Sequence, residues 1–166
     1  MNGLGGTHAA RYQRLLEPIL EQAAGYALAI VRHRADAEDA VQEAATKGYQ
    51  AFARYDPGRP FKGWWFTILR NCCRDLVRGR RCPAATSLAG LAAKAQPPPG
   101  EEPWEDLAQA MDRLSPDHRE ILRLRYFGQC SYREIAAALG IPEGTVMSRL
   151  HAARQRLAVL YHEEEP

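Results

Sequence analysis

The order of apolar and polar residues predicts helices along most of the chain. Apolar residues recur every three or four positions in "RYQRLLEPILEQAAGYALAIVRHR" (residues 11–34) and in "DAEDAVQEAATKGYQAFARY" (residues 36–55). This is the period of an amphipathic helix. Pro18 predicts a kink or break in the first segment, because proline removes a helical hydrogen bond. Asp36 is the predicted N-cap of the second segment. We expect an all-α fold.

A third segment, "FKGWWFTILRNCCRDLVRGRR" (residues 61–81), combines an apolar stripe with a basic face. The stripe consists of Phe61, Trp64, Trp65, Ile68, Leu69, Cys72 and Leu76. A stripe of this kind is typical of a helix that faces a core. Residues 57–81 contain seven Lys or Arg and one Asp, a charge of +6, although the whole chain carries only +2. The basic face is therefore either a solvated surface or a binding surface for phosphates.

A change in composition divides the chain into two modules. Residues 82–103, "CPAATSLAGLAAKAQPPPGEEP", contain five prolines and two glycines, which is typical of a linker. We therefore expect an N-terminal domain (residues 1–81), a flexible linker (82–103) and a C-terminal domain (104–166), both domains small and helical.

The C-terminal module has the pattern of a helix-turn-helix. Ser131 and Glu134 have capping-box spacing, and Gly140 ends the predicted helix. The apolar face of the next helix consists of Val146, Leu150, Ala153, Leu157 and Leu160. Its outer face carries short polar and arginine side chains, and a helix with such a face fits the DNA major groove. A plain helical hairpin has the same pattern, so both interpretations remain open here.

Several classes of function and location are not expected. Cys72, Cys73, Cys82 and Cys130 show no C-x-x-C spacing, so we expect reduced thiols rather than a zinc site or a disulfide framework. The N-terminus "MNGLGGTHAA" lacks the features of a signal peptide. No apolar run approaches the ~20 residues of a membrane span. We expect a cytoplasmic protein without membrane insertion.

Catalytic motifs are also not apparent. The sequence has no nucleophile with a paired base, no phosphate-cradling glycine loop and no carboxylate dyad. We therefore expect no catalytic residues, no bound metal, no cofactor and no enzymatic activity.

The segments that carry these motifs occur in a recognisable order. "DAEDAVQEAATKGYQAF" and the basic segment 61–81 precede the linker, and "LSPDHREILRLRYFGQCSYREIAAALGIPEGTVMSRLHAARQRL" follows it. Together they resemble the small extracytoplasmic-function group of bacterial sigma factors. The resemblance implies a protein that binds core RNA polymerase, recognises the minus-35 promoter element as duplex and the minus-10 element as a single strand, and assists DNA melting. It also implies control by an anti-sigma factor.

The resemblance assigns roles to residues of the N-terminal module. Asp39, Gln42 and Glu43 match the family pattern D-x-x-Q-E on the helix that docks on the polymerase. The residues implied to contact the minus-10 strand are Tyr55, Arg59, Phe61, Asn71, Arg74 and Arg78. The first three belong to the loop that lines the pocket for an extruded base, and the two last arginines would follow the DNA backbone.

In the C-terminal module, the resemblance implies contacts between the recognition helix and the minus-35 duplex. The implied residues are Thr145, Ser148, Arg149, His151 and Arg154. This chain departs from the family pattern at Met147 and Ala152, where Lys or Arg is frequent. The loss of two cations predicts weaker phosphate affinity with a smaller salt dependence.

Two other functions remain as alternatives. An autonomous helix-turn-helix regulator accounts for the C-terminal module alone, and it predicts tight duplex binding without polymerase. A sigma mimic that acts as a decoy for a regulator would not need the basic segment. The retained arginines therefore favour a DNA-binding protein over a decoy.

Overall fold

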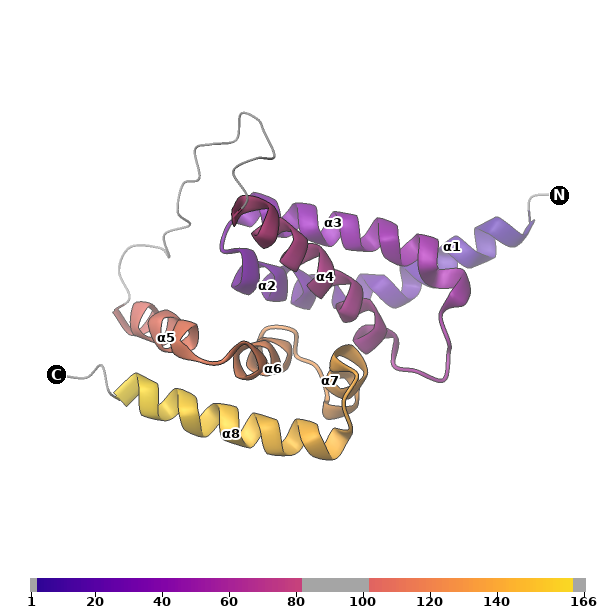
Figure 1. The fold of residues 1–166 in the computed structure, drawn as a ribbon. Helices are drawn as coiled ribbons and strands as arrows, with labels where there is room; N and C mark the ends of the chain where they lie inside the picture. The colour runs from indigo at the N-terminus through magenta and orange to yellow at the C-terminus, as the bar shows by residue number, and fades with distance from the viewer. Residues whose placement is uncertain (1–2, 82–101, 163–166) are drawn as a thin grey trace.

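The computed structural model describes residues 3–81 and 102–162, and every regular element in these ranges is a helix. The N-terminal unit comprises α1 (Gly3–Leu16), α2 (Leu20–Val31), α3 (Arg34–Ala51) and α4 (Phe61–Arg81). The C-terminal unit comprises α5 (Glu102–Arg113), α6 (Pro116–Tyr126), α7 (Tyr132–Leu139) and α8 (Glu143–His162). The predicted all-α class is confirmed (Figure 1). Residues 82–101 of the predicted linker lie outside the described ranges.

Helix boundaries in the N-terminal unit follow local chemistry, with one correction. Pro18 lies in a short 3-10 turn, Glu17–Ile19, which separates α1 from α2 as its sequence predicted. The prediction that Asp36 caps α3 is wrong, because the helix begins two residues earlier. His33 is the N-cap, and its ring Nδ1 accepts a hydrogen bond from the Asp36 amide (3.4 Å). Asp36 instead lies in the first turn, where the helix dipole favours a carboxylate.

Small residues let α3 pack closely in the core of the N-terminal unit. The buried positions of this helix are Ala37, Ala40, Ala44 and Gly48. A Cβ atom on Gly48 would lie 3.0 Å from the indole nitrogen of Trp65, so a larger residue does not fit without movement. That indole nitrogen donates a hydrogen bond to the Tyr12 hydroxyl (3.0 Å), which donates in turn to the Ala45 carbonyl (2.8 Å). Helices α1 and α3 are thereby connected to α4.

The helix-turn-helix predicted for the C-terminal unit is present in α7 and α8. Ser131 and Glu134 form the expected capping box at the start of α7. Gly140 ends this helix with a φ of 67°, a conformation that costs a glycine little. Val146 and Leu150 bury the inner face of α8, as its pattern predicted.

The two units pack directly against each other, which the sequence pattern did not predict. Helix α7 lies against α4, and α6 approaches α2 (Figure 1). As a result α4 has a second buried side, made by Gly63, Phe66 and Cys73, in addition to the predicted stripe. None of the described helices has the length and hydropathy of a membrane span.

Candidate nucleic-acid interface

The loop between α3 and α4 rests on a cluster of aromatic rings. Tyr55 stacks on Phe52, with ring centroids 5.6 Å apart and planes 11° apart. The Tyr55 ring also lies 4.9 Å from Trp64 and 5.6 Å from Phe61. These rings pack on the interior side of the loop, so the polar atoms of the loop lie at the surface. Tyr55 and Phe61 are half-buried within the cluster.

Hydrogen bonds within the loop fix its shape. The Gly58 amide donates to the Asp56 carboxylate (2.9 Å), and the Arg59 amide donates to the Asp56 carbonyl (3.1 Å). The Tyr55 hydroxyl donates to the carbonyl of Arg59 (2.6 Å). The Arg59 side chain is exposed beside this ordered turn. The loop therefore presents a cation next to an aromatic surface, a combination suited to an unpaired nucleotide.

Three polar side chains line one exposed face of α4. Asn71, Arg74 and Arg78 follow one another at helical spacing and lie on the same side. The Arg78 guanidinium is 78% exposed and lies 3.8 Å from Asp75, and such a surface pair is weak. Arg74 is about half exposed and lies 3.9 Å from Glu120 of the C-terminal unit. Of these three predicted minus-10 residues, Asn71 and Arg78 are exposed, whereas Arg74 lies at the contact between the units.

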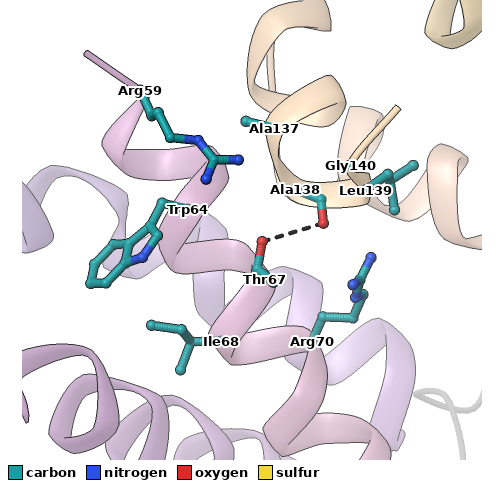
Figure 2. Close-up of a pocket in the computed structure, with 9 residues that line it drawn as sticks. All are labelled: Arg59, Trp64, Thr67, Ile68, Arg70, Ala137, Ala138, Leu139 and Gly140. Carbon is teal, nitrogen blue, oxygen red and sulfur yellow. Dashed lines mark hydrogen bonds between the residues drawn. The ribbon is translucent and has the colours of Figure 1, made fainter. Parts of the chain in front are cut away.

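A cavity of about 280 Å³ lies between α4 and the end of α7. Its lining residues are Arg59, Trp64, Thr67, Ile68, Arg70, Ala137, Ala138, Leu139 and Gly140. Figure 2 shows that Arg59 and Arg70 approach it from opposite ends, while the Thr67 hydroxyl donates to the Ala138 carbonyl (3.3 Å). Sequence reasoning did not select Thr67 or Arg70. The sequence around these two residues does not distinguish them, because it carries no sign that α7 covers this side of α4.

An acidic and amide-bearing face lies on α3, opposite its small buried residues. Asp39, Gln42 and Glu43 are all exposed, and their spacing places them on one side of the helix. Glu43 accepts a charged hydrogen bond from Lys47 (2.7 Å). This hydrogen bond raises the pKa of Lys47, although both side chains are near half exposed. The face is free for a partner that offers cations and donors.

Helix α8, which carries the candidate recognition surface, lies along the edge of the C-terminal unit that is remote from the N-terminal unit (Figure 1). Ser148, His151 and Arg154 are exposed, whereas Thr145 is half-buried at the start of the helix. The Ser148 hydroxyl donates to main-chain carbonyls of its own helix, which satisfies it locally. Met147 is 57% exposed on the same surface, so an apolar side chain stands where a cation is frequent in the related pattern.

The two arginines of this surface differ in their burial and in their hydrogen-bond and ion-pair partners. Arg149 is half-buried and pairs with Asp117 of α6, at 3.4 Å. Arg154 is exposed, and its Nε donates to the Leu150 carbonyl (3.4 Å). Arg154 is therefore directly available to a ligand, while Arg149 must first leave its carboxylate partner.

The three cysteines in the described parts of the chain do not form a reactive or metal-binding group. Cys72, Cys73 and Cys130 are buried free thiols, and burial raises the pKa of both Cys73 and Cys130 to about 12. At neutral pH these two side chains are therefore protonated and poor nucleophiles. In the described parts of the chain, His, Cys, Asp and Glu side chains nowhere gather in threes around a possible metal position. Cys82 lies outside the described residues.

Comparison with protein-family models gives two matches, one for each unit. Residues 11–82 match the model of sigma-70 region 2, and residues 104–157 match that of sigma-70 region 4. The two models together span most of the chain, in the same order as the sequence blocks described above.

Relatives of known name match over most of their length. The SigL sigma factor of Mycobacterium tuberculosis is 32% identical, over 98% of this chain and 96% of its own. CarQ, an RNA polymerase sigma factor of Myxococcus xanthus, is 33% identical over 85% of this chain and 83% of its own. A solved structure with the same fold is that of the sigma factor RpoE of Bartonella quintana in complex with the anti-sigma factor NepR. Its TM-score is 0.67 and its sequence identity is 28%. The match covers 93% of this chain and 99% of RpoE.

Proposed function

Because this chain belongs to the sigma-70 family, in the extracytoplasmic-function group of RNA polymerase sigma factors, we propose that it directs core RNA polymerase to its own set of promoters. The observation that carries the proposal is the separation of three surfaces with different chemistry. An acidic face lies on α3, a basic face on α4 and a polar recognition surface on α8. A subunit that contacts polymerase and two promoter elements needs three such surfaces.

The minus-10 element is the proposed ligand of the N-terminal unit. The loop around Arg59 combines a fixed turn with an aromatic support, and Asn71, Arg74 and Arg78 extend a polar track along α4. Cations that follow the backbone and a pocket for an unpaired base are what binding of a separated strand requires. Holding one strand in this way would assist DNA melting.

The minus-35 element is the proposed ligand of α8. Exposed Ser148, His151 and Arg154 lie on the outer face of the second helix of a helix-turn-helix, the helix that enters the major groove in this motif. Thr145 and Arg149 flank this group and would contribute after small side-chain movements. The assignment of residues 1–81 and 104–166 as separate promoter-binding domains, joined by residues 82–103, is part of this proposal.

Two protein partners follow from the proposal. Core RNA polymerase would bind the α3 face through Asp39, Gln42 and Glu43. An anti-sigma factor is the second partner, because the related RpoE of Bartonella quintana binds the anti-sigma factor NepR. We assign the chemical steps of transcription to the polymerase and none to this chain, and we place its action in the cytoplasm, where promoter DNA is present.

Run-off transcription from pooled genomic fragments tests the proposal. Bacterial core polymerase is used with and without this protein, and we expect discrete new start sites that depend on it. Alignment of the sequences upstream of these sites would then define both promoter elements. Changes confined to the starts of an existing holoenzyme would identify a helix-turn-helix regulator instead. Absence of both an effect and core binding would support the decoy function.

A matched pair of variants tests the polymerase contact separately. Asp39→Asn removes an exposed charge from the proposed docking face, so it should weaken core binding in a pull-down or anisotropy titration. Glu38→Gln removes an exposed charge from the neighbouring position of the same helix, where it pairs with Arg34 at 3.0 Å. Equal effects of the two substitutions would show that net charge, and not the proposed face, governs binding.

A further inference from the structure

Helix α1 packs on the aromatic ring that supports the loop between α3 and α4. The ring of His8 lies 4.9 Å from that of Phe52, and the ring of Tyr12 lies 5.1 Å from it. Residues four apart lie on the same side of a helix, so this side of α1 faces the short 3-10 turn Phe52–Arg54. Figure 1 shows α1 beside the end of α3 from which the loop departs. Helix α1 is therefore a neighbour of the loop, although the resemblance assigned it no contact with DNA.

Arg11 of α1 extends over the same ring. Its guanidinium carbon lies 5.7 Å from the centroid of the Phe52 ring, a distance typical of a cation–π contact. Tyr55 stacks on this ring as well. Burial raises the pKa of Tyr55, and the positive charge of Arg11 opposes that rise. Because Arg11 is also exposed, its N–H groups are positioned beside the loop and remain accessible to a ligand.

The described arginines of the N-terminal unit fall into two groups. Those of the first group form ion pairs with carboxylates, and they are Arg32, Arg34, Arg74 and Arg78. Those of the second group have no carboxylate partner among the described residues, and they are Arg11, Arg14, Arg54, Arg59 and Arg70. Three members of the second group, Arg11, Arg54 and Arg59, belong to the segments that meet at the aromatic cluster. Their charges are therefore available to an anionic ligand.

The local sequence adds little negative charge to this surface. Helix α1 contains two arginines and no acidic residue, and residues 52–60 contain two arginines and one aspartate, which gives +3 for the two segments together. The single carboxylate, that of Asp56, accepts the hydrogen bond from the Gly58 amide (2.9 Å). The surface around the loop is thus basic, and one of its cations comes from a helix that lies far from the loop in sequence.

The position of these cations relative to α4 suggests a continuous path. The polar side chains of α4 run from Arg78 through Arg74 to Asn71, toward the start of the helix at Phe61. The loop lies at that start. Beyond the loop, the next cations are Arg54 in the 3-10 turn and Arg11 on α1. Cations therefore lie on both sides of the loop.

We propose that α1 is part of the strand-binding surface, in which Arg11 and Arg54 contact the nucleotides that continue a single DNA strand past the base held at the loop. The inference rests on the proposed function, because that function makes the loop the site of an unpaired base. An arginine with one face on an aromatic ring offers planar N–H donors to a phosphate and its other face to a base. A strand bound on both sides of the extruded base has less freedom to return to the duplex.

An acidic protein segment is the competing ligand for such a surface, because three arginines attract carboxylates as well as phosphates. The aromatic neighbours favour nucleic acid. Arg11 and Arg59 lie beside the half-buried ring of Tyr55, and single strands are bound by cations combined with rings on which bases stack. An acidic peptide has no use for the ring.

Two arginines provide a matched test in the full chain. Arg11→Gln and Arg34→Gln each remove one exposed positive charge from the N-terminal unit. Arg34 is the first residue of α3, at the opposite end of that helix from the loop, and its side chain is 89% exposed. Arg11→Lys keeps the charge but not the planar group. Arg54→Gln tests the second proposed contact.

The first measurement is fluorescence anisotropy over a series of salt concentrations, without polymerase. The probe is a fluorescein-labelled oligothymidylate of about 12 nucleotides, within the usual range of single-strand binding sites. We expect Arg11→Gln and Arg54→Gln each to weaken binding severalfold and to reduce the slope of log affinity against log salt by about 0.7, the value for one phosphate contact. Arg11→Lys should recover the slope, and Arg34→Gln should match the unmodified protein. Equal losses in Arg11→Gln and Arg34→Gln, or no binding by the unmodified protein, would overturn the proposal.

The second measurement compares the binding of the same variants to core RNA polymerase. We expect Arg11→Gln to bind core as the unmodified protein does, with an unchanged midpoint of urea denaturation. Loss of core binding with unchanged affinity for the oligonucleotide would assign the surface to a protein partner and overturn the proposal. The transcription assay described above decides the proposed function separately. If that assay fails while Arg11→Gln selectively loses affinity for the strand, the proposed function is wrong and the strand contact stands.

Discussion

The guanidinium Nη1 of Arg149 lies 3.4 Å from Oδ2 of Asp117, so the recognition surface of α8 is partly neutralised by the first turn of α6. The Arg149 side chain is only 28% exposed, whereas that of Asp117 is 73% exposed. The carboxylate therefore competes with any phosphate or base for this arginine.

Removing the competing charge should strengthen binding to duplex DNA. We expect Asp117→Asn to tighten binding of the full chain to a minus-35 duplex by up to about fivefold, since an exposed ion pair contributes at most about 1 kcal/mol. Fluorescence anisotropy at fixed salt measures the change. Glu21→Gln makes the same change in net charge on α2, away from α8. An equal gain for both variants would argue against the specific pairing.

A cation at position 147 should increase the salt dependence of duplex binding. Met147 is exposed on the recognition surface, so Met147→Lys would add a phosphate contact and steepen the slope of log affinity against log salt by about 1. Val159→Lys adds the same charge at an exposed position elsewhere on α8. If the two lysines steepen the slope equally, position 147 does not face the DNA backbone.

The hydrogen bond between Trp65 and Tyr12 should contribute measurably to stability. Tyr12→Phe leaves the buried indole N–H without its acceptor, which should lower the free energy of unfolding by about 1–3 kcal/mol. Urea denaturation measures the loss. Tyr49→Phe, at an exposed tyrosine of α3, is the control and should have little effect. A loss of the same size in both variants would contradict the role assigned to the buried bond.

The buried thiols should make the fold less stable in alkali. Unfolded cysteine ionises near about pH 8.5, whereas the pKa of Cys73 and Cys130 in the fold is about 12. Between these values the unfolded chain has fewer bound protons, so the free energy of unfolding falls as pH rises from about 9. Urea titrations at several pH values measure this slope. The double variant Cys73→Ala, Cys130→Ala should show a shallower slope; an unchanged slope would assign the alkaline loss to other groups.

Local chemistry explains why much of the fold was predictable. Ser131, Glu134 and Gly140 each act within one helical turn, so the boundaries of α7 can be read directly from the sequence. The apolar stripe of α4 likewise predicted the buried positions of Trp65 and Leu69. Asp36 shows the limit of such reasoning, because His33, three residues before the predicted N-cap, has the capping role instead.

The contacts between distant segments could not be predicted in the same way. Gly63 and Phe66 carry no local signal that a second helix will cover them, since periodicity identifies one buried face and not two. The pairs Arg149–Asp117 and Arg74–Glu120 depend on the arrangement of whole helices. The resemblance assigned DNA-facing roles to these arginines, but it did not predict that carboxylates of the same chain would lie beside them. Those DNA-facing roles remain predictions.

The neighbouring indoles of α4 have one practical consequence. Trp64 lines the cavity beside α7, whereas Trp65 is fully enclosed in the N-terminal core. With Trp104 replaced by phenylalanine, the protein would therefore contain two optical probes on adjacent residues. A red shift in the emission of Trp64 would follow loosening of the cavity between the units. The emission of Trp65 would change only when the N-terminal helix bundle unfolds. The fluorescence of these two tryptophans would thus distinguish a rearrangement of the folded units from unfolding, without any attached dye.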